Sequence, residues 1–203
     1  MFPSGGISML DATVVATLSY LLGSVPFGMV IARIMGLGNL REIGSGNIGA
    51  TNVLRTGNKL AAFLTLVCDA GKGGVAVLIA NAAFGPTAAQ IAGAAAFLGH
   101  LYPVWLKFKG GKGVATFLGI MLALNFWVGL AACLTWLATA FVTRISSASA
   151  LVASLSAPVW LAIFGMPDAI FMSLFLAILV WLRHHANIKR LLSGTEPRIG
   201  KKG

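Results

Sequence analysis

Seven apolar runs constrain the fold of this chain more than any other feature of its sequence. Most of them approach the length of about 20 residues that an α-helix needs to cross the hydrocarbon core of a bilayer. Because backbone groups in lipid must be hydrogen-bonded within the protein, such runs fold as helices. We therefore predict an all-α integral membrane protein. The runs lie at residues 12–32, 60–82, 87–106, 114–125, 126–143, 147–164 and 167–182.

The composition agrees with a membrane protein. Of the 203 residues, 58% are hydrophobic and only 10% are charged, whereas a soluble domain carries about 25% charged residues. The stretch 114–143 is too long for one crossing and short for two, so it predicts one or two short helices. We expect about seven transmembrane helices and a single transmembrane domain over residues 1–203. Cys68 and Cys133 lie inside apolar runs, which favours packed thiols over a disulfide.

The placement of charge predicts an orientation. The net charge is +10, and the basic residues, apart from Lys72 and Arg144, cluster at 33–59, 107–112 and 183–202, whereas residues 1–11 hold no Lys or Arg. By the positive-inside rule these clusters are cytoplasmic, with the amino terminus outside and the carboxyl terminus in the cytoplasm. A cleavable signal peptide is not expected, because the basic n-region is missing. No basic stripe alternates with exposed aromatic residues, so we expect no nucleic-acid partner.

The first polar island runs from Arg41 to Arg55 and is suited to holding an anion. Glycine lets backbone N–H groups approach an anion closely, and Arg55 offers a bidentate fork to phosphate. A short helix over residues 50–56, ended by Gly57, would place Thr51 and Arg55 on one face. The alternatives are a flexible interhelical loop and, for Arg55, an ordinary juxtamembrane charge. The other candidate binding residues here are Gly44, Ser45, Gly46, Asn47, Gly49 and Asn52.

Two phosphate-loop motifs are excluded by their context. Residues 44–49 match G-x-G-x-x-G, but the dinucleotide fingerprint needs a βαβ unit, whereas apolar runs flank this segment. The second polar island, residues 107–113, lacks the spacing of a Walker loop and the Ser or Thr after Lys112. Lys112 is still a good point charge for phosphate, while Lys107 and Lys109 are typical interface anchors. Its candidate binding residues are Gly110, Gly111, Lys112 and Gly113.

Two charged residues fall inside the second apolar run. Asp69 and Lys72 are three residues apart, and an unpaired charge at that depth costs about 3 kcal/mol. Mutual pairing is the simpler interpretation, and a polar cavity beneath the site is the alternative. His100, close to the second island, is as well suited to helix packing as to chemistry.

The third polar island, residues 183–196, holds the remaining histidines. His184 suits proton transfer near neutral pH, while His185 has the simpler interpretation of a solvent-exposed side chain. The histidines are scattered and lack clustered Cys, Asp or Glu, so we expect no metal site and no cofactor. Ser147 and Ser149 would donate to phosphate or cap a helix.

Together these islands resemble the bacterial acyl-phosphate:glycerol-3-phosphate acyltransferases, the PlsY-type family. The resemblance covers residues 20–197 and is carried mainly by Gly-Ser-Gly-Asn-Ile-Gly-Ala-Thr-Asn at 44–52 and Phe-Lys-Gly-Gly-Lys-Gly at 108–113. It also includes residues 23–28, 69–73 and 99–100, then Arg183-His184, Asn187 and Gly194-Thr195-Glu196.

The resemblance implies a seven-helix enzyme of the bacterial inner membrane with its active site on the cytoplasmic face. Such an enzyme transfers a fatty acyl group from acyl phosphate to the sn-1 hydroxyl of glycerol 3-phosphate, which gives lysophosphatidic acid and phosphate. By similarity Ser45, Arg55, Lys112, His184 and Asn187 are active-site residues, and Ser147, Ser149 and Glu196 contact substrate. The three islands are then expected to converge on one anion-binding pocket.

The residues themselves favour direct transfer over an acyl-enzyme. No His-x-x-x-x-Asp pair and no Ser-His-Asp set is evident in the sequence. His184 is the best candidate for a general base in the protein, and a substrate phosphate oxygen is the alternative. The rival class is a membrane transporter of phosphate or a small organic anion. It explains seven spans and basic loops equally well, and it predicts a polar path through the bilayer.

Overall fold

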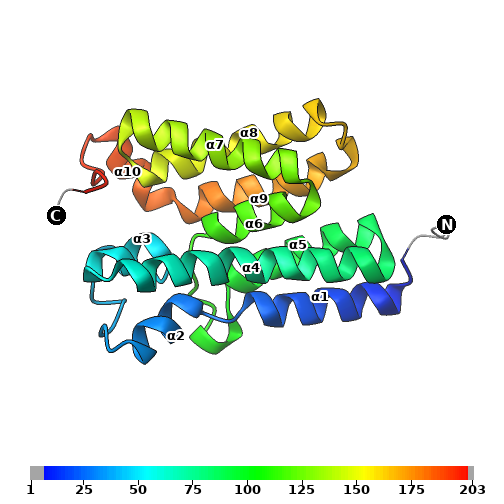
Figure 1. The fold of residues 1–203 in the computed structure, drawn as a ribbon, viewed down its shortest axis with the longest axis horizontal. Coiled ribbons are helices and arrows are strands. Elements are labelled where there is room, and N and C mark those ends of the chain that lie inside the picture. The colour runs from blue at the N-terminus through cyan, green and yellow to red at the C-terminus, as the bar shows by residue number, and fades with distance from the viewer. Residues whose placement is uncertain (1–6, 201–203) are drawn as a thin grey trace. The chain divides into compact units, whose positions relative to one another are not determined.

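The computed structural model describes residues 7–200, which fold into helices and connecting loops without any β-strand (Figure 1). The chain divides into two compact units, Met1–Leu124 and Asn125–Gly203, here called the amino-terminal and carboxyl-terminal units. Residues 1–6 and 201–203 lie outside the described residues. The orientation predicted from residues 1–11 therefore rests partly on residues that the structure does not describe. The all-α fold is confirmed.

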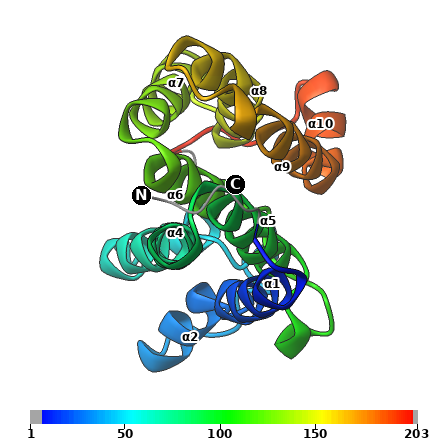
Figure 2. The same cartoon turned by 90° about the vertical axis from the view of Figure 1, so that its right-hand side faces the viewer.

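The amino-terminal unit is built around α5, Pro86–Leu101. This helix packs against α1, α4 and α6, with α1 below it and α4 and α6 to its left in Figure 2. Small side chains let the backbones approach closely, as in the core formed by Ala76, Ala80, Ala88, Ala92 and Ala96. The other helices of the unit are α1 Met9–Gly23, α2 Phe27–Ile34, α3 Ala50–Val53, α4 Lys59–Phe84 and α6 Val114–Leu124, with 3₁₀ turns at Leu54–Thr56 and Val104–Leu106.

The first predicted run, 12–32, is a broken helix rather than a continuous one. Pro26 has no backbone N–H and stands between α1 and α2. At the break the Val25 carbonyl accepts from the backbone N–H of Phe27 at 3.1 Å and from Lys72 Nζ at 2.9 Å. Lys72 also lies 2.8 Å from Asp69 Oδ1. The predicted pairing of Asp69 with Lys72 is therefore confirmed.

The carboxyl-terminal unit consists of helices joined by short connections. Asn125 begins α7 by accepting hydrogen bonds from the backbone N–H groups of Trp127 and Val128. The stretch 114–143 therefore holds two helices, α6 of 11 residues and α7 of 18 residues, which is one of the alternatives that the sequence left open. Within this unit α8 packs against α7 and α9, and α10 bends by 64° from the helical segment before it. The bounds are α7 Phe126–Thr143, α8 Ser146–Ile163, a 3₁₀ turn Pro167–Ala169, α9 Ile170–Arg183 and α10 His185–Leu192.

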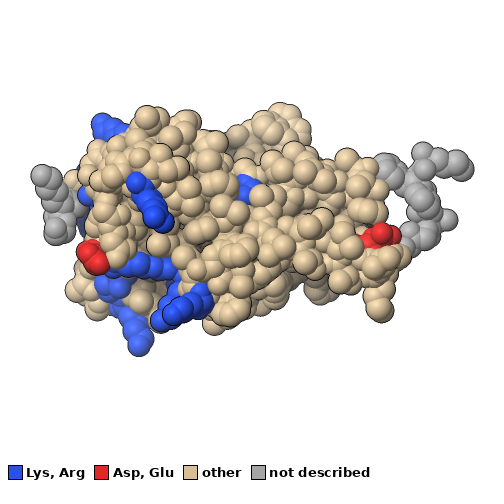
Figure 3. Space-filling model, turned by 90° about the horizontal axis from the view of Figure 1, so that it is seen from below, with Lys and Arg blue, Asp and Glu red and all other residues tan. Residues whose placement is uncertain are grey.

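Within residues 7–200, four helical segments are long and apolar enough to span a membrane, or five if the bent segment from Pro167 to Leu192 counts as one. All seven predicted apolar runs are helical, but seven crossings stay a prediction. Large apolar side chains point outward, with Phe141 88% and Phe171 84% exposed, and most of the face drawn in Figure 3 carries no charge. Such a surface is typical of a protein that meets lipid. Both cysteines are free thiols, as predicted.

Candidate functional site

The helical segment after the first polar loop forms where the sequence predicted it. Residues 50–53 are α-helical and 54–56 continue as a 3₁₀ turn. Gly57 ends the segment with φ of 88°, a left-handed conformation that glycine adopts without steric cost. Thr51 and Arg55 are both exposed on this segment. The predicted helix and its end are therefore confirmed.

The buried side chain of Asn52 holds the first loop, residues 35–49, through several hydrogen bonds. Its side chain is 1% exposed. The Asn52 amide donates to the backbone oxygens of Leu40, at 3.0 Å, and Asn47, at 2.7 Å. Its Oδ1 accepts from the backbone N–H of Ser45 at 3.1 Å and from the Ser45 hydroxyl at 3.3 Å. The structure therefore places Asn52 as a support of the loop, with both amide hydrogens already used inside the protein.

Arg55 lies directly over Gly44. A Cβ atom at Gly44 would stand only 2.6 Å from Arg55 Cδ and Nη1, and the backbone there has φ of +53°. The left-handed backbone favours glycine here, and any Cβ atom would displace the Arg55 side chain. The neighbouring Ser45 is exposed. The guanidinium and the Ser45 hydroxyl therefore belong to one polar surface of the amino-terminal unit.

The second loop, residues 107–113, is bound to the end of α5. The backbone N–H of Gly110 donates to Leu101 O at 3.0 Å, and that of Gly111 donates to His100 O at 3.1 Å. These hydrogen bonds use donors that the sequence analysis expected to serve an anion. Lys112 is half-buried in this segment, whereas Lys107 and Lys109 are exposed.

Arg41 joins the two loops. Its Nη1 donates to Gly46 O in the first loop at 3.1 Å, and its Nη2 donates to Lys109 O in the second. The first and second polar islands therefore lie together within the amino-terminal unit. Sequence reasoning assigned Arg41 no role, because its partners are carbonyl groups that carry no signal in the sequence.

The Glu196 carboxylate connects the third island internally and links it to α8. The carboxylate Oε1 accepts from Ser147 Oγ at 2.7 Å and from Asn187 Nδ2 at 2.5 Å. Its Oε2 accepts from Arg190 Nε at 2.6 Å. The side chain of Glu196 is 7% exposed. The structure therefore brings together the predicted residues Ser147, Asn187 and Glu196, and it adds Arg190, which the sequence analysis did not single out.

These contacts shift the titration of Glu196. Burial favours the neutral carboxyl, but hydrogen bonds from Asn187, Ser147 and Arg190, together with the Arg190 charge, outweigh burial and lower the pKa of Glu196. The contribution of this carboxylate to stability is therefore complete above its unfolded pKa of about 4.3, and it is lost as pH falls through the lower folded pKa.

We expect Glu196→Gln to lower the free energy of unfolding by about 2 kcal/mol at pH 7, because hydrogen bonds to a charged group are lost. Thermal unfolding in detergent at pH 7 and below pH 4 is the measurement, and the difference from the parent should shrink at the lower pH. Glu42→Gln is the control, since Glu42 is exposed and lies in the first loop. An equal loss at both pH values would contradict the assignment.

His184 is held in one orientation at the junction of α9 and α10. Its side chain is 3% exposed, and its Nδ1 lies 2.7 Å from the carbonyl oxygen of Val180. A carbonyl oxygen can only accept, so Nδ1 carries the hydrogen and Nε2 of the neutral ring is the basic nitrogen. His185, in contrast, is exposed as predicted.

Ser149 is buried and serves its own helix. Its hydroxyl donates to Ile145 O at 2.9 Å, within the first turn of α8. Neither serine provides the side-chain cap that the sequence analysis considered, because the N-cap residue of α8 is Ile145. Ser147 bonds Glu196 instead, so its hydroxyl links α8 to the third island.

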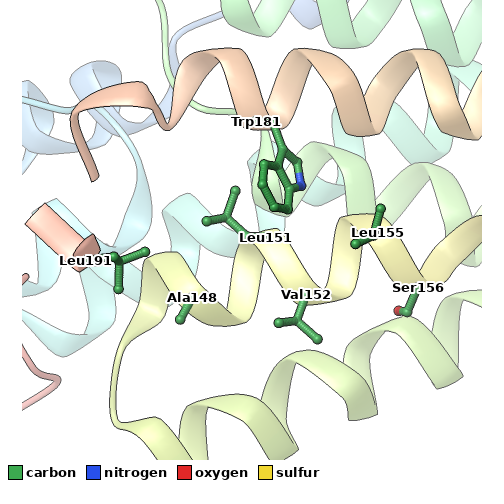
Figure 4. Close-up of a pocket in the computed structure, with 7 residues that line it drawn as sticks. All are labelled: Ala148, Leu151, Val152, Leu155, Ser156, Trp181 and Leu191. Atoms are coloured by element: carbon green, nitrogen blue, oxygen red, sulfur yellow. The ribbon is translucent and has the colours of Figure 1, made fainter. Parts of the chain in front are cut away.

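An apolar groove lies along α8 in the carboxyl-terminal unit (Figure 4). Its volume is about 450 Å³, and it runs beside Trp181 of α9 and Leu191 of α10. Ala148, at one end, directly follows Ser147 in the chain. The groove therefore begins beside the polar third island. Its lining residues are Ala148, Leu151, Val152, Leu155, Ser156, Trp181 and Leu191.

A family model described as glycerol-3-phosphate acyltransferase matches residues 13–194. The chain is 62% identical over 194 residues to the glycerol-3-phosphate acyltransferase of Cereibacter sphaeroides, covering 96% of this chain and 92% of that protein. It is also 62% identical over 199 residues to the glycerol-3-phosphate acyltransferase of Roseobacter denitrificans, covering 96% of this chain and 100% of that protein.

Two solved structures of PlsY, described as an integral membrane glycerol 3-phosphate acyltransferase, share this fold. The glycerol 3-phosphate form is 42% identical with a TM-score of 0.89, covering 93% of this chain and 96% of that one. The lysophosphatidic acid form is 40% identical with a TM-score of 0.86, covering 93% and 95%. By the family match over both units and by these relatives, the chain belongs to the glycerol-3-phosphate acyltransferase family and is an acyltransferase.

Proposed function

We propose that this enzyme transfers a fatty acyl group from acyl phosphate to the sn-1 hydroxyl of glycerol 3-phosphate. The products are lysophosphatidic acid and inorganic phosphate. The acceptor and product are supported by the two PlsY structures, which are described as glycerol 3-phosphate and lysophosphatidic acid forms. The single observation in this chain that carries the proposal is the bridge made by Arg41. It holds the first loop, where Arg55 lies over Gly44, together with the second loop, which carries Lys112, within the amino-terminal unit.

Both proposed substrates carry phosphate, and the two loops offer the matching groups. Arg55 presents a planar fork and Lys112 a point charge, while the exposed residue Ser45 directly follows Gly44, over which Arg55 lies. The N–H groups of Gly110 and Gly111 already donate to α5, so the grip on phosphate rests mainly on these side chains. Each lost donor of this kind typically costs about 10²–10³ in rate.

The proposed reaction is a direct displacement. The sn-1 hydroxyl oxygen attacks the carbonyl carbon of the acyl phosphate, and the bond from that carbon to the phosphate oxygen breaks. Phosphate leaves with the bonding electron pair, stabilised by Arg55 and Lys112. The hydroxyl proton passes to His184 Nε2 or to a phosphate oxygen, whose second pKa is near 6. Asn187 is proposed as a further active-site residue, as the family resemblance implies. Its amide is oriented by the hydrogen bond to Glu196.

We assign the donor's acyl chain to the groove along α8. The lining is almost entirely apolar, and burying each CH₂ group contributes about 0.8 kcal/mol. The carboxyl-terminal unit would therefore hold the acyl chain along α8.

Replacing Trp181 with alanine should weaken binding of the donor alone. We expect the KM for palmitoyl phosphate to rise about tenfold, which corresponds to about 1.4 kcal/mol of lost contact. The KM for glycerol 3-phosphate should stay near the parent value. Trp127→Ala is the matched control, because Trp127 is 60% exposed and does not line the groove. An equal rise in both KM values would remove the groove from the donor site.

The membrane arrangement is part of the proposal. Seven crossings of the bacterial inner membrane, with the loops and the carboxyl terminus in the cytoplasm, follow from the positive-inside rule. The seven helical runs are compatible with this count. We also propose that residues 1–203 act as one transmembrane acyltransferase domain, since a single family model spans most of both units.

A phosphate or anion transporter is the rival function. In that interpretation Asp69 and Lys72 should line a polar passage. They instead pair with each other, and both are buried, at 2% and 4% exposure. The two charges therefore neutralise each other, which does not support a role in binding a transported anion.

The deciding experiment supplies purified protein with palmitoyl phosphate and glycerol 3-phosphate and follows phosphate release. Release should require both substrates and should yield lysophosphatidic acid acylated at sn-1, as identified by NMR. Palmitoyl-CoA in place of palmitoyl phosphate should give no product. Uptake of labelled phosphate into liposomes without acyl transfer would establish the transporter instead.

A further inference from the structure

A buried ionic cluster lies in the amino-terminal unit and takes no part in the proposed reaction. Asp69 and Lys72 stand on α4, and His100 stands on α5. Lys72 Nζ lies 2.8 Å from Asp69 Oδ1, and His100 Nδ1 lies 3.6 Å from the same oxygen. All three residues are 4% exposed or less. The cluster therefore joins the two helices inside the unit.

The far side of the cluster touches the second loop. A Cβ atom at Gly111 would stand 2.2 Å from His100 Nε2, so the imidazole ring lies directly against this glycine. The Gly111 N–H also donates to His100 O at 3.1 Å. One residue of α5 thus contacts Gly111 with both its backbone and its side chain, immediately before Lys112.

The opposite side of the cluster reaches the break between α1 and α2. Lys72 Nζ donates to Val25 O at 2.9 Å, just before Pro26. The first loop follows α2, and Arg41 of that loop contacts Lys109 O of the second. The second loop is therefore held by Arg41 at Lys109 and by His100 at Gly111, and the cluster behind His100 is anchored to the helices that carry the first loop.

We infer that Asp69, Lys72 and His100 are positioning residues that fix the place of Lys112 without touching substrate. His100 acts through the volume of its ring beneath Gly111. Asp69 orients that ring, and Lys72 balances the charge of Asp69 within the helix bundle. This inference rests on the proposed function, in which Lys112 contacts the phosphate of glycerol 3-phosphate.

A double-mutant cycle between Gly111 and His100 tests the contact directly. Gly111→Ala pushes a methyl group into the ring, and His100→Ala removes the support of the loop. Each single change should raise the KM for glycerol 3-phosphate about tenfold, because small displacements of a binding group are costly. The kcat value should change much less. The double variant should recover most of the parent KM, because removing the ring makes room for the methyl group.

Independent losses that multiply in the double variant would overturn the inference, and so would a fall in kcat at constant KM. The second variant, Asp69→Asn with Lys72→Met, removes both charges and should raise the same KM in protein that remains monodisperse in detergent. An unchanged KM there would also overturn it. Ser154→Ala is the control for loss of a buried polar group, since the Ser154 hydroxyl donates to Leu151 O within α8.

The activity of the parent enzyme distinguishes a failure of the proposed function from a failure of the positioning role. If the parent produces no lysophosphatidic acid from palmitoyl phosphate and glycerol 3-phosphate, the proposed function fails. If the parent is active and the cycle shows no coupling, the positioning role alone fails.

Discussion

Arg55→Ala should lower kcat/KM for acyl transfer by about 10²–10³-fold, the usual loss when a donor to developing negative charge is removed. The Arg55 side chain lies over Gly44, and the exposed residue Ser45 follows Gly44 in the chain. Arg41, the arginine of the first loop, bonds Gly46 O and Lys109 O instead. Arg55→Lys should recover only part of the loss, because an ammonium group cannot reproduce the bidentate fork. Steady-state rates with both substrates varied are the measurement.

Arg33→Ala is the matched control for this prediction. Arg33 is an exposed arginine in the last turn of α2, within the same unit and outside the first loop. This control separates the effect of losing one positive charge from the effect of losing the proposed phosphate contact of Arg55. If Arg33→Ala reduced kcat/KM as much as Arg55→Ala, the effect would belong to the overall charge of the unit and the phosphate contact would be refuted.

His184→Ala should reduce the single-turnover rate by about 10²–10⁴-fold if His184 is the general base. The ring is buried, and the bond from Nδ1 to Val180 O leaves Nε2 as the basic nitrogen. Single-turnover measurements isolate the chemical step from product release. The parent should also lose rate as pH falls through the pKa of its base, and His184→Ala should lack that limb.

The neighbouring His185 supplies the control. It is exposed, and His185→Ala should leave the single-turnover rate close to that of the parent. A near-normal rate for His184→Ala would remove His184 as the base. The proton would then pass to a phosphate oxygen of the substrate, whose second pKa near 6 suits that role.

Local features of the fold could be predicted because their causes are local. The apolar runs specify helices, since hydrogen bonds within each segment are required wherever the chain meets lipid. Gly57 ends the segment 50–56 because glycine tolerates the left-handed conformation found there. The pairing of Asp69 with Lys72 followed from their spacing of three residues on one helix.

The partners of the polar side chains could not be predicted in the same way. Asn52 was expected to bind substrate, but its amide supports the first loop through Leu40 O and Asn47 O. Glu196 was expected to contact substrate, and its carboxylate is bonded to Ser147, Asn187 and Arg190. The functional roles of these residues stay predictions, and the structure adds that they shape the protein around the proposed ligands.

The sequence by itself determined the class of protein, its helices and the three polar islands, because composition and periodicity report the solvent that each segment meets. Only the tertiary structure decided which groups meet across the chain. Arg41 reaches Lys109 O over 68 positions, and Lys72 reaches Val25 O over 47. Their acceptors are backbone carbonyls, which every residue possesses, so no residue type in the sequence marks them.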